Sequence, residues 1–95
     1  DFMAFTQQLV TPEDPNALIQ QLVDLFYVNP ISFQVMDDLK IQYLLLGQMN
    51  DQYWTDAYQT YLADPNTTDM AAQLVPDILH WLIGDMQQAA EHHLF

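Results

Sequence analysis

A run of oxygen-bearing residues between two expected helices is the part of the sequence whose spacing could support metal chemistry. Asp64, Asn66 and Thr68 place side-chain oxygens at alternate positions, as at the start of a calcium-binding loop. A complete loop of this type also needs a glycine at its sixth position and a bidentate acid at its twelfth, where this chain has Asp69 and Val75. A turn that ends one helix and caps the next explains every residue of the segment, and calcium binding is kept as the alternative.

Other groupings of titratable side chains fall short of a catalytic or metal site. Asp77 and His80 lie one helical turn apart, and Glu91 precedes His92 and His93 near the C-terminus. A di-metal site in a helical bundle needs Glu-x-x-His pairs on separate helices and further Glu residues on others, and only one imperfect pair exists. The chain has no cysteine, no Gly-x-Ser-x-Gly motif and no glycine-rich loop. We therefore predict no catalytic residue, no cofactor and no committed metal ligand, and we favour a non-enzymatic protein over an enzyme.

A band of aromatic residues follows helical spacing in the middle of the chain. It comprises Tyr53, Trp54, Tyr58 and Tyr61. Such a stripe is more often part of a core than of a binding surface, but its outward members could contact a partner protein or a sugar. These four residues are the partner-binding candidates, and Tyr53 is the one expected to be most exposed.

The charge balance excludes two classes of partner. Thirteen Asp and Glu residues stand against a single base, Lys40, which gives a formal net charge of -12 with neutral histidines. Nucleic-acid binding depends on Lys and Arg that neutralise phosphates, and anionic membrane surfaces likewise attract basic segments. No apolar run approaches the ~20 residues that a membrane span requires. The sequence therefore predicts a soluble chain without nucleic-acid binding and without membrane insertion.

Capping residues and prolines divide the chain into helices, and 51% of its residues are hydrophobic, enough for one core. The expected helices span residues 15–28, from Ser32 to Gly47, from Asp51 to Asp64, and from Thr67 or Thr68 to His93. Asp14 is the expected N-cap of the first helix, Pro15 stands at its first position, and Asn29-Pro30 ends it. Ser32, Asp51 and Thr67 or Thr68 are the expected caps of the others, and Gly47 is the expected left-handed stop.

One proline lies inside the last expected helix. Pro76 removes a backbone hydrogen bond and clashes with the preceding turn, so the helix is expected to kink or split near it. Because the connections are short, successive helices should be antiparallel neighbours. Residues 1–95 are therefore predicted to form a single all-α domain, a compact bundle of about four antiparallel helices.

The second expected helix has an unusually wide apolar stripe. Its core positions are Val35, Met36, Leu39, Tyr43 and Leu46. Phe33, Ile41, Leu44 and Leu45 widen the stripe beyond the face that one neighbour would cover. We therefore expect this helix to make contacts on two sides.

Four segments together resemble a known family. They are Thr11–Ile19, Tyr43–Gln48, Asn50–Tyr58 and Ala89–Phe95. The chain resembles the C-terminal portion of a large, mostly helical, exported bacterial family of unknown function that is commonly encoded beside a sulfatase-like protein. The resemblance implies a fragment or C-terminal module of a longer protein, located in the periplasm or outside the cell. No catalytic residue is implied by the resemblance.

The functional prediction is a non-enzymatic helical module for interaction or structure. The module would pack against the remainder of a parent protein or against a protein partner, through the wide stripe of the second helix and the aromatic band. The alternative is a ligand-binding or calcium-binding domain that uses the turn from Asp64 to Asp69.

Overall fold

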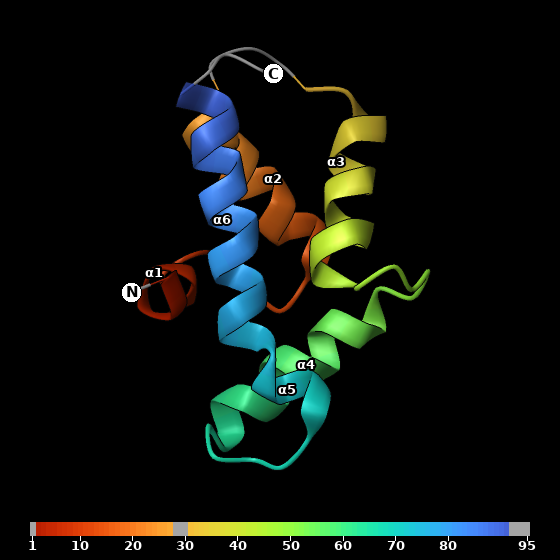
Figure 1. Cartoon of the computed structure of the whole chain (residues 1–95), viewed down its shortest axis with the longest axis vertical. Helices are drawn as coiled ribbons and strands as arrows, with labels where there is room; N and C mark the ends of the chain where they lie inside the picture. Colours follow the sequence, from red (N-terminus) through yellow and green to blue (C-terminus); the bar gives the residue numbers. More distant parts are fainter. Residues whose placement is uncertain (1, 28–30, 92–95) are drawn as a thin grey trace.

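Six α-helices and one π-helical turn follow one another in the computed structural model, which describes residues 2–27 and 31–91 and contains no strand among them (Figure 1). The α-helices are α1 (Phe2–Gln7), α2 (Pro15–Phe26), α3 (Phe33–Leu39), α4 (Gln52–Ala63), α5 (Met70–Gln73) and α6 (Val75–Glu91), and the π turn η1 (Lys40–Leu44) continues α3. Four of the α-helices have at least seven residues. The prediction of an all-α domain with about four main helices is confirmed.

Helix α6 is the centre of the molecule. It packs against α1, α2, η1, α4 and α5, and Figure 1 shows these elements around it, with α3 at the edge. The α6 residues of the core are Val75, Ile78, Leu79, Leu82, Ile83 and Met86. Burying each large apolar side chain contributes about 1.5–3 kcal/mol, so this stripe is a substantial source of stability.

The first main helix begins as the sequence predicts. The Asp14 carboxylate accepts hydrogen bonds from the backbone N–H groups of Asn16 and Ala17 at 2.9 and 3.4 Å, and Pro15 occupies the first helical position. Helix α2 ends at Phe26. The predicted extension to Val28 is wrong, because Tyr27 already has an extended backbone with φ of -114° and ψ of 133°. Val28 itself and the predicted stop at Asn29-Pro30 lie outside the described residues.

The second expected helix is divided into α3 and η1. Ser32 caps α3 as predicted, since its hydroxyl accepts a hydrogen bond from the Val35 N–H at 3.2 Å. At the C-terminal end, the Gly47 N–H donates to the Ile41 carbonyl at 2.8 Å, a typical helix-ending bond. The predicted left-handed stop is confirmed at Gly47, with φ of 84°, and it begins one residue earlier at Leu46, with φ of 50°.

One predicted cap, Asp51, occupies the N-cap position of α4 without a capping bond, and another is wrong. The Asp51 side chain makes no capping bond to α4, and the Asn50 carboxamide oxygen instead accepts from the Gln52 N–H at 3.1 Å. Asp69, rather than Thr67 or Thr68, caps α5 by accepting from the Ala72 N–H at 2.9 Å. In both cases the better-placed oxygen lies one or two residues away from the predicted cap.

The break near Pro76 is confirmed. Leu74 separates α5 from α6, and Pro76 lies in the first turn of α6. There its missing N–H costs no intrahelical bond, because the first N–H groups of a helix have no partner within it. The predicted end of this segment at His93 lies outside the described residues.

Candidate functional site

Lys40, the single Lys or Arg of the sequence, is the buried centre of a polar network. Its Nζ lies 2.9 Å from Asn16 Oδ1, 3.2 Å from Asp37 Oδ1 and 3.1 Å from Asp51 Oδ1, although Lys40 is only 9% exposed. The Asn16 amide nitrogen in turn donates to Asp51 Oδ2 at 2.9 Å. Three acceptors match the three N–H donors of an ammonium group. The network therefore joins the start of α2, the end of α3 and the residue before α4, and it uses the full hydrogen-bonding capacity of Lys40.

The contacts within the network raise the pKa of Lys40 and lower the pKa of Asp51, and both shifts favour the charged forms. Burial alone would lower the pKa of Lys40, but the hydrogen bonds and charges of Asp51 and Asp37 together raise it above its ordinary value. The hydrogen bond from Asn16 and the interactions with Lys40 outweigh burial and lower the pKa of Asp51. The Lys40 ammonium group therefore joins the start of α2, the end of α3 and the residue before α4.

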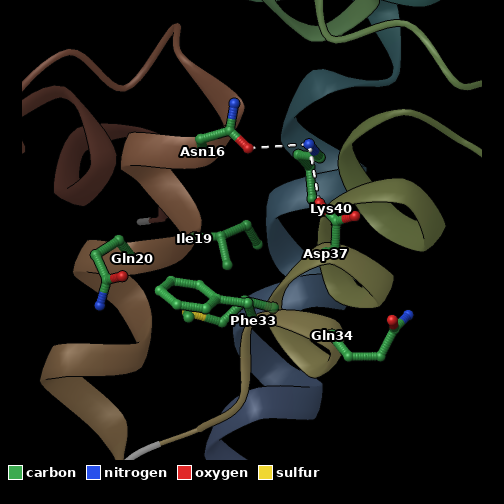
Figure 2. Close-up of a pocket in the computed structure, with 8 residues that line it drawn as sticks. Asn16, Ile19, Gln20, Phe33, Gln34, Asp37 and Lys40 are labelled. Atoms are coloured by element: carbon green, nitrogen blue, oxygen red, sulfur yellow. Dashed lines mark hydrogen bonds and ion pairs between the residues drawn. The ribbon is translucent and has the colours of Figure 1, made fainter.

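A groove of about 450 Å³ opens between α2 and α3, next to this network. Its lining residues are Asn16, Ile19, Gln20, Phe33, Gln34, Met36, Asp37 and Lys40. Figure 2 shows the Phe33 ring projecting from α3 towards α2, with Asn16 and Lys40 at the other end of the groove. The groove thus has an apolar end formed by Ile19, Phe33 and Met36, and a polar end closed by the Lys40 network.

Two of the lining residues, Gln20 and Gln34, hold acidic side chains that do not themselves line the groove. On α2, the Gln20 amide donates to Asp24 at 3.0 Å. On α3, the Gln34 amide donates to Asp38 at 3.0 Å, one residue after Asp37. Asp24, Asp37 and Asp38 are all exposed, whereas the positive charge of Lys40 is compensated within its network. Asp37 and Lys40 are the charged residues that line the groove, and they are paired with each other.

Helix α3 is incompletely covered. None of its residues is fully buried, and Phe33 is 85% exposed. Leu44 and Leu45, which reach the core, belong to the continuation of the helix rather than to α3 itself. The second expected helix as a whole does pack against two neighbours, α2 and α6, and its packing against α6 is made mainly by η1.

The aromatic candidates fall into two groups. Trp54 and Tyr58 are 0% and 1% exposed and belong to the core, where their ring centroids lie 5.4 Å apart. The Trp54 indole N–H donates to the Pro12 carbonyl at 2.9 Å. Tyr53 and Tyr61 are half-buried at the edge of the core. Trp54 and Tyr58 thus stabilise the fold and present no surface to a partner, and only Tyr53 and Tyr61 remain as surface candidates from this band.

The oxygen-rich turn is organised by its own backbone. Asp64 accepts from the Asn66 N–H at 3.1 Å, and Thr67 Oγ1 accepts from the Asp69 N–H at 3.2 Å, while Asp69 caps α5. Asp64, Asn66 and Thr68 are exposed. Across residues 2–27 and 31–91, no group of three or more His, Asp or Glu side chains is arranged to hold a metal ion. These contacts support the interpretation as a turn between helices.

The remaining candidates are not gathered into a site. Asp77 and His80 are exposed on α6, and the His80 ring packs 5.7 Å from the ring of Phe2. His92 and His93 lie outside the described residues.

The Lys40 network and the groove are the features that sequence reasoning missed. One signal was available, because Lys40 is the only base in an acidic chain and Asp37 precedes it by one helical turn. No local signal linked Asn16 or Asp51 to Lys40, since only the tertiary fold brings the start of α2 and the residue before α4 to this side chain.

Comparison with known proteins found no matching protein family, no similar curated protein and no similar solved structure. The resemblance to the exported bacterial family stays a prediction that rests on the four quoted segments. In the part of the chain that the structure describes, no helix combines the length and apolar composition that a bilayer crossing needs.

Proposed function

We propose that this chain is a non-enzymatic interaction module whose α3 face packs against a protein partner or against the remainder of a parent protein. The observation that carries the proposal is the exposure of α3. This helix contains the apolar residues Phe33, Val35, Met36 and Leu39, yet none is fully buried. Phe33 is the exposed member, since Met36 and Leu39 are partly buried against the core, and covering the Phe33 side chain would contribute about 1.5–3 kcal/mol.

The chemistry of the described residues supports a binding role over catalysis. Lys40, the only base, is held by three acceptors, and the carboxylates of Asp64 and Asp69 accept bonds from backbone amides. These side chains support the fold and do not converge on a reacting position. The resemblance to an exported family supports a periplasmic or extracellular setting for the module, which fractionation of cells that express the native gene would test.

Site-specific photo-crosslinking in the native cell tests the proposed surface. A photo-reactive amino acid placed at Phe33 is expected to give a discrete cross-linked product. The same amino acid at Met70, which is 78% exposed on α5, is the matched control and should not give that product. A chain that cross-links at neither position, or equally at both, would contradict an interaction through α3.

A further inference from the structure

A pocket separate from the α2–α3 groove lies where the end of α1, the segment before α2 and helix α4 meet. Its volume is about 430 Å³, which is within the ~300–1,000 Å³ typical of small-molecule sites. Its lining residues are Gln7, Pro12, Glu13, Tyr58, Gln59 and Leu62. The size of the pocket suits a small ligand, and its lining residues decide which kind.

Hydrogen bonds between distant segments fix the walls of this pocket. Thr55 Oγ1 donates to the Glu13 carbonyl at 2.8 Å and so holds the segment before α2 against α4. The Tyr58 hydroxyl lies 3.4 Å from Thr6 Oγ1 and holds α1 against the same helix. The pocket is therefore formed by the fold itself and does not need a ligand to assemble it.

Three polar side chains of the pocket are free to bind a ligand. The Glu13 carboxylate and the carboxamides of Gln7 and Gln59 make no hydrogen bond to any residue that the structure describes. By contrast, three other glutamines, on α2, α3 and α4, each donate to an Asp four residues later. The pocket thus keeps unused hydrogen-bonding groups on three sides.

The Glu13 carboxylate gives the pocket a local negative charge. Burial raises the pKa of the Tyr58 hydroxyl, the hydrogen bond with Thr6 opposes this rise, and the charge of Glu13 adds to it. A carboxylate whose charge acts on this buried hydroxyl lies on the pocket side of its segment. Glu13 is the one charged side chain among the six lining residues, so no Lys or Arg of the pocket compensates it.

The Lys40 network shows which group such atoms hold in this protein. Its ammonium group lies 2.9 to 3.2 Å from one carboxamide oxygen and two carboxylate oxygens. The pocket offers the same two kinds of oxygen, from one carboxylate and two carboxamides, without an ammonium group of its own. We infer that the pocket binds a small organic cation, whose ammonium group lies at the Glu13 carboxylate and the two carboxamides.

The apolar part of the pocket accommodates the stem of this cation. Leu62 is 44% exposed and lies on the same face of α4 as Gln59, three residues earlier. Pro12 is half-buried on the opposite segment. A short alkyl stem would cover both side chains, which favours an alkylammonium ion over an inorganic cation.

Titration of the whole 95-residue chain with n-butylammonium chloride, followed by the side-chain amide signals of isotope-labelled protein, tests the inference. A background of about 0.15 M NaCl screens diffuse attraction to an acidic chain. We expect the signals of Gln7 and Gln59 to shift along one saturation curve, and those of Gln87, exposed on α6, to stay unchanged. Shifts confined to residues outside the pocket would overturn the site.

Two ligands of similar size separate charge from apolar contact. The neutral n-butanol and the anion butyrate should each bind at least about tenfold more weakly than n-butylammonium, because neither donates charged N–H groups to the carboxylate. Equal binding of n-butanol would overturn the role of the ammonium group. Displacement of n-butylammonium by calcium at equal ionic strength would make the pocket a metal site and would also overturn the inference.

Matched variants locate the bound cation. Glu13→Gln should weaken binding about tenfold, and Gln59→Ala about two- to fivefold. Asp77→Asn and Gln87→Ala are their controls, because both residues are exposed on α6 outside the pocket and should leave affinity unchanged. Circular dichroism of Glu13→Gln should match the wild type, since the carboxylate makes no bond within the described chain. Equal losses in Glu13→Gln and Asp77→Asn would show diffuse attraction to an acidic protein and would overturn the pocket.

This site stands independently of the proposed interaction through α3, because the two share no residue. Binding of n-butylammonium without a cross-link from Phe33 would contradict the interaction module and support the pocket. A cross-link from Phe33, together with no amide shift at Gln7 or Gln59, would overturn the pocket and leave the interaction module intact.

Discussion

Replacement of Lys40 by methionine is the sharpest test of how this acidic chain holds its helices together. Methionine keeps the length and apolar stem of the side chain but removes the ammonium group that contacts Asn16, Asp37 and Asp51. The two carboxylates stay in contact with water, since their side chains are 57% and 49% exposed. The substitution therefore removes the joint without leaving a buried unpaired charge.

The magnitude follows from the three contacts. A hydrogen bond such as that to Asn16 contributes about 1 kcal/mol. Each ion pair with a half-exposed carboxylate contributes about 0.5 kcal/mol after solvent screening. Part of this loss of stability is offset, because the variant has no ammonium group whose burial would cost desolvation free energy. We therefore expect Lys40→Met to lower the free energy of unfolding by about 1.5 kcal/mol, which corresponds to about 8 °C in Tm for a domain of this size.

Urea unfolding followed by circular dichroism measures the change, and one variant controls for net charge. Lys40→Met makes the chain more negative by one charge, and Gln48→Glu does the same at an exposed position. Gln48→Glu should change stability by less than about 0.5 kcal/mol. A double-mutant cycle of Lys40→Met with Asp51→Asn should give a coupling energy of about 0.5–1 kcal/mol.

The pH dependence of the difference has a defined sign. The pKa of Asp51 is lowered in the folded state by Asn16 and Lys40, so the stability from this carboxylate is present above its ordinary value of 3.8 and is lost as the pH falls through the lowered pKa. The advantage of the wild type over Lys40→Met should therefore shrink in acid. A Lys40→Met chain as stable as the wild type at neutral pH would refute the reasoning, because desolvation would then cancel all three contacts.

Three further predictions test separate features. Replacing each of the two glycines by alanine should change the thermal stability in opposite directions. Gly84→Ala, within α6 and with free space around the new methyl group, should stabilise the fold by about 0.5–1 kcal/mol, whereas Gly47→Ala, at φ of 84°, should destabilise it by about 1 kcal/mol. A change of the same sign at both sites would contradict the assigned backbone. Burial, and then the hydrogen bond and charge of Asp85, raise the pKa of Tyr43 from 10.0 to about 12, so the wild type should lose stability between these pH values, and Tyr43→Phe should reduce that loss in alkaline urea titrations. Calcium chloride should raise Tm no more than magnesium chloride at equal ionic strength, because the turn that starts at Asp64 is organised by its own backbone; a calcium-specific rise would restore the calcium alternative.

The candidate site was only partly foreseeable from the sequence. The apolar width of the second expected helix was visible, and it pointed to the face where Phe33 is now found exposed. The groove beside that face was not visible in the sequence, because Ile19 and Met36 line the groove together only after α2 and α3 have packed. The aromatic band shows the same limit, since helical spacing put Trp54 and Tyr58 on one face without saying that this face is the core.

The sequence by itself determined the main helices and the break near Pro76. Asp14, Ser32 and Pro76 act on backbone groups a few residues away, so their effects are read correctly without any tertiary contact. Net charge is likewise a sum over residues and needs no coordinates. Tertiary structure decided where competing side chains go: Asp51 was a plausible cap for its own helix, but its carboxylate meets Lys40 and Asn16 across the fold instead. That choice depends on distances between segments far apart in the chain, and these distances exist only once the helices have packed around α6.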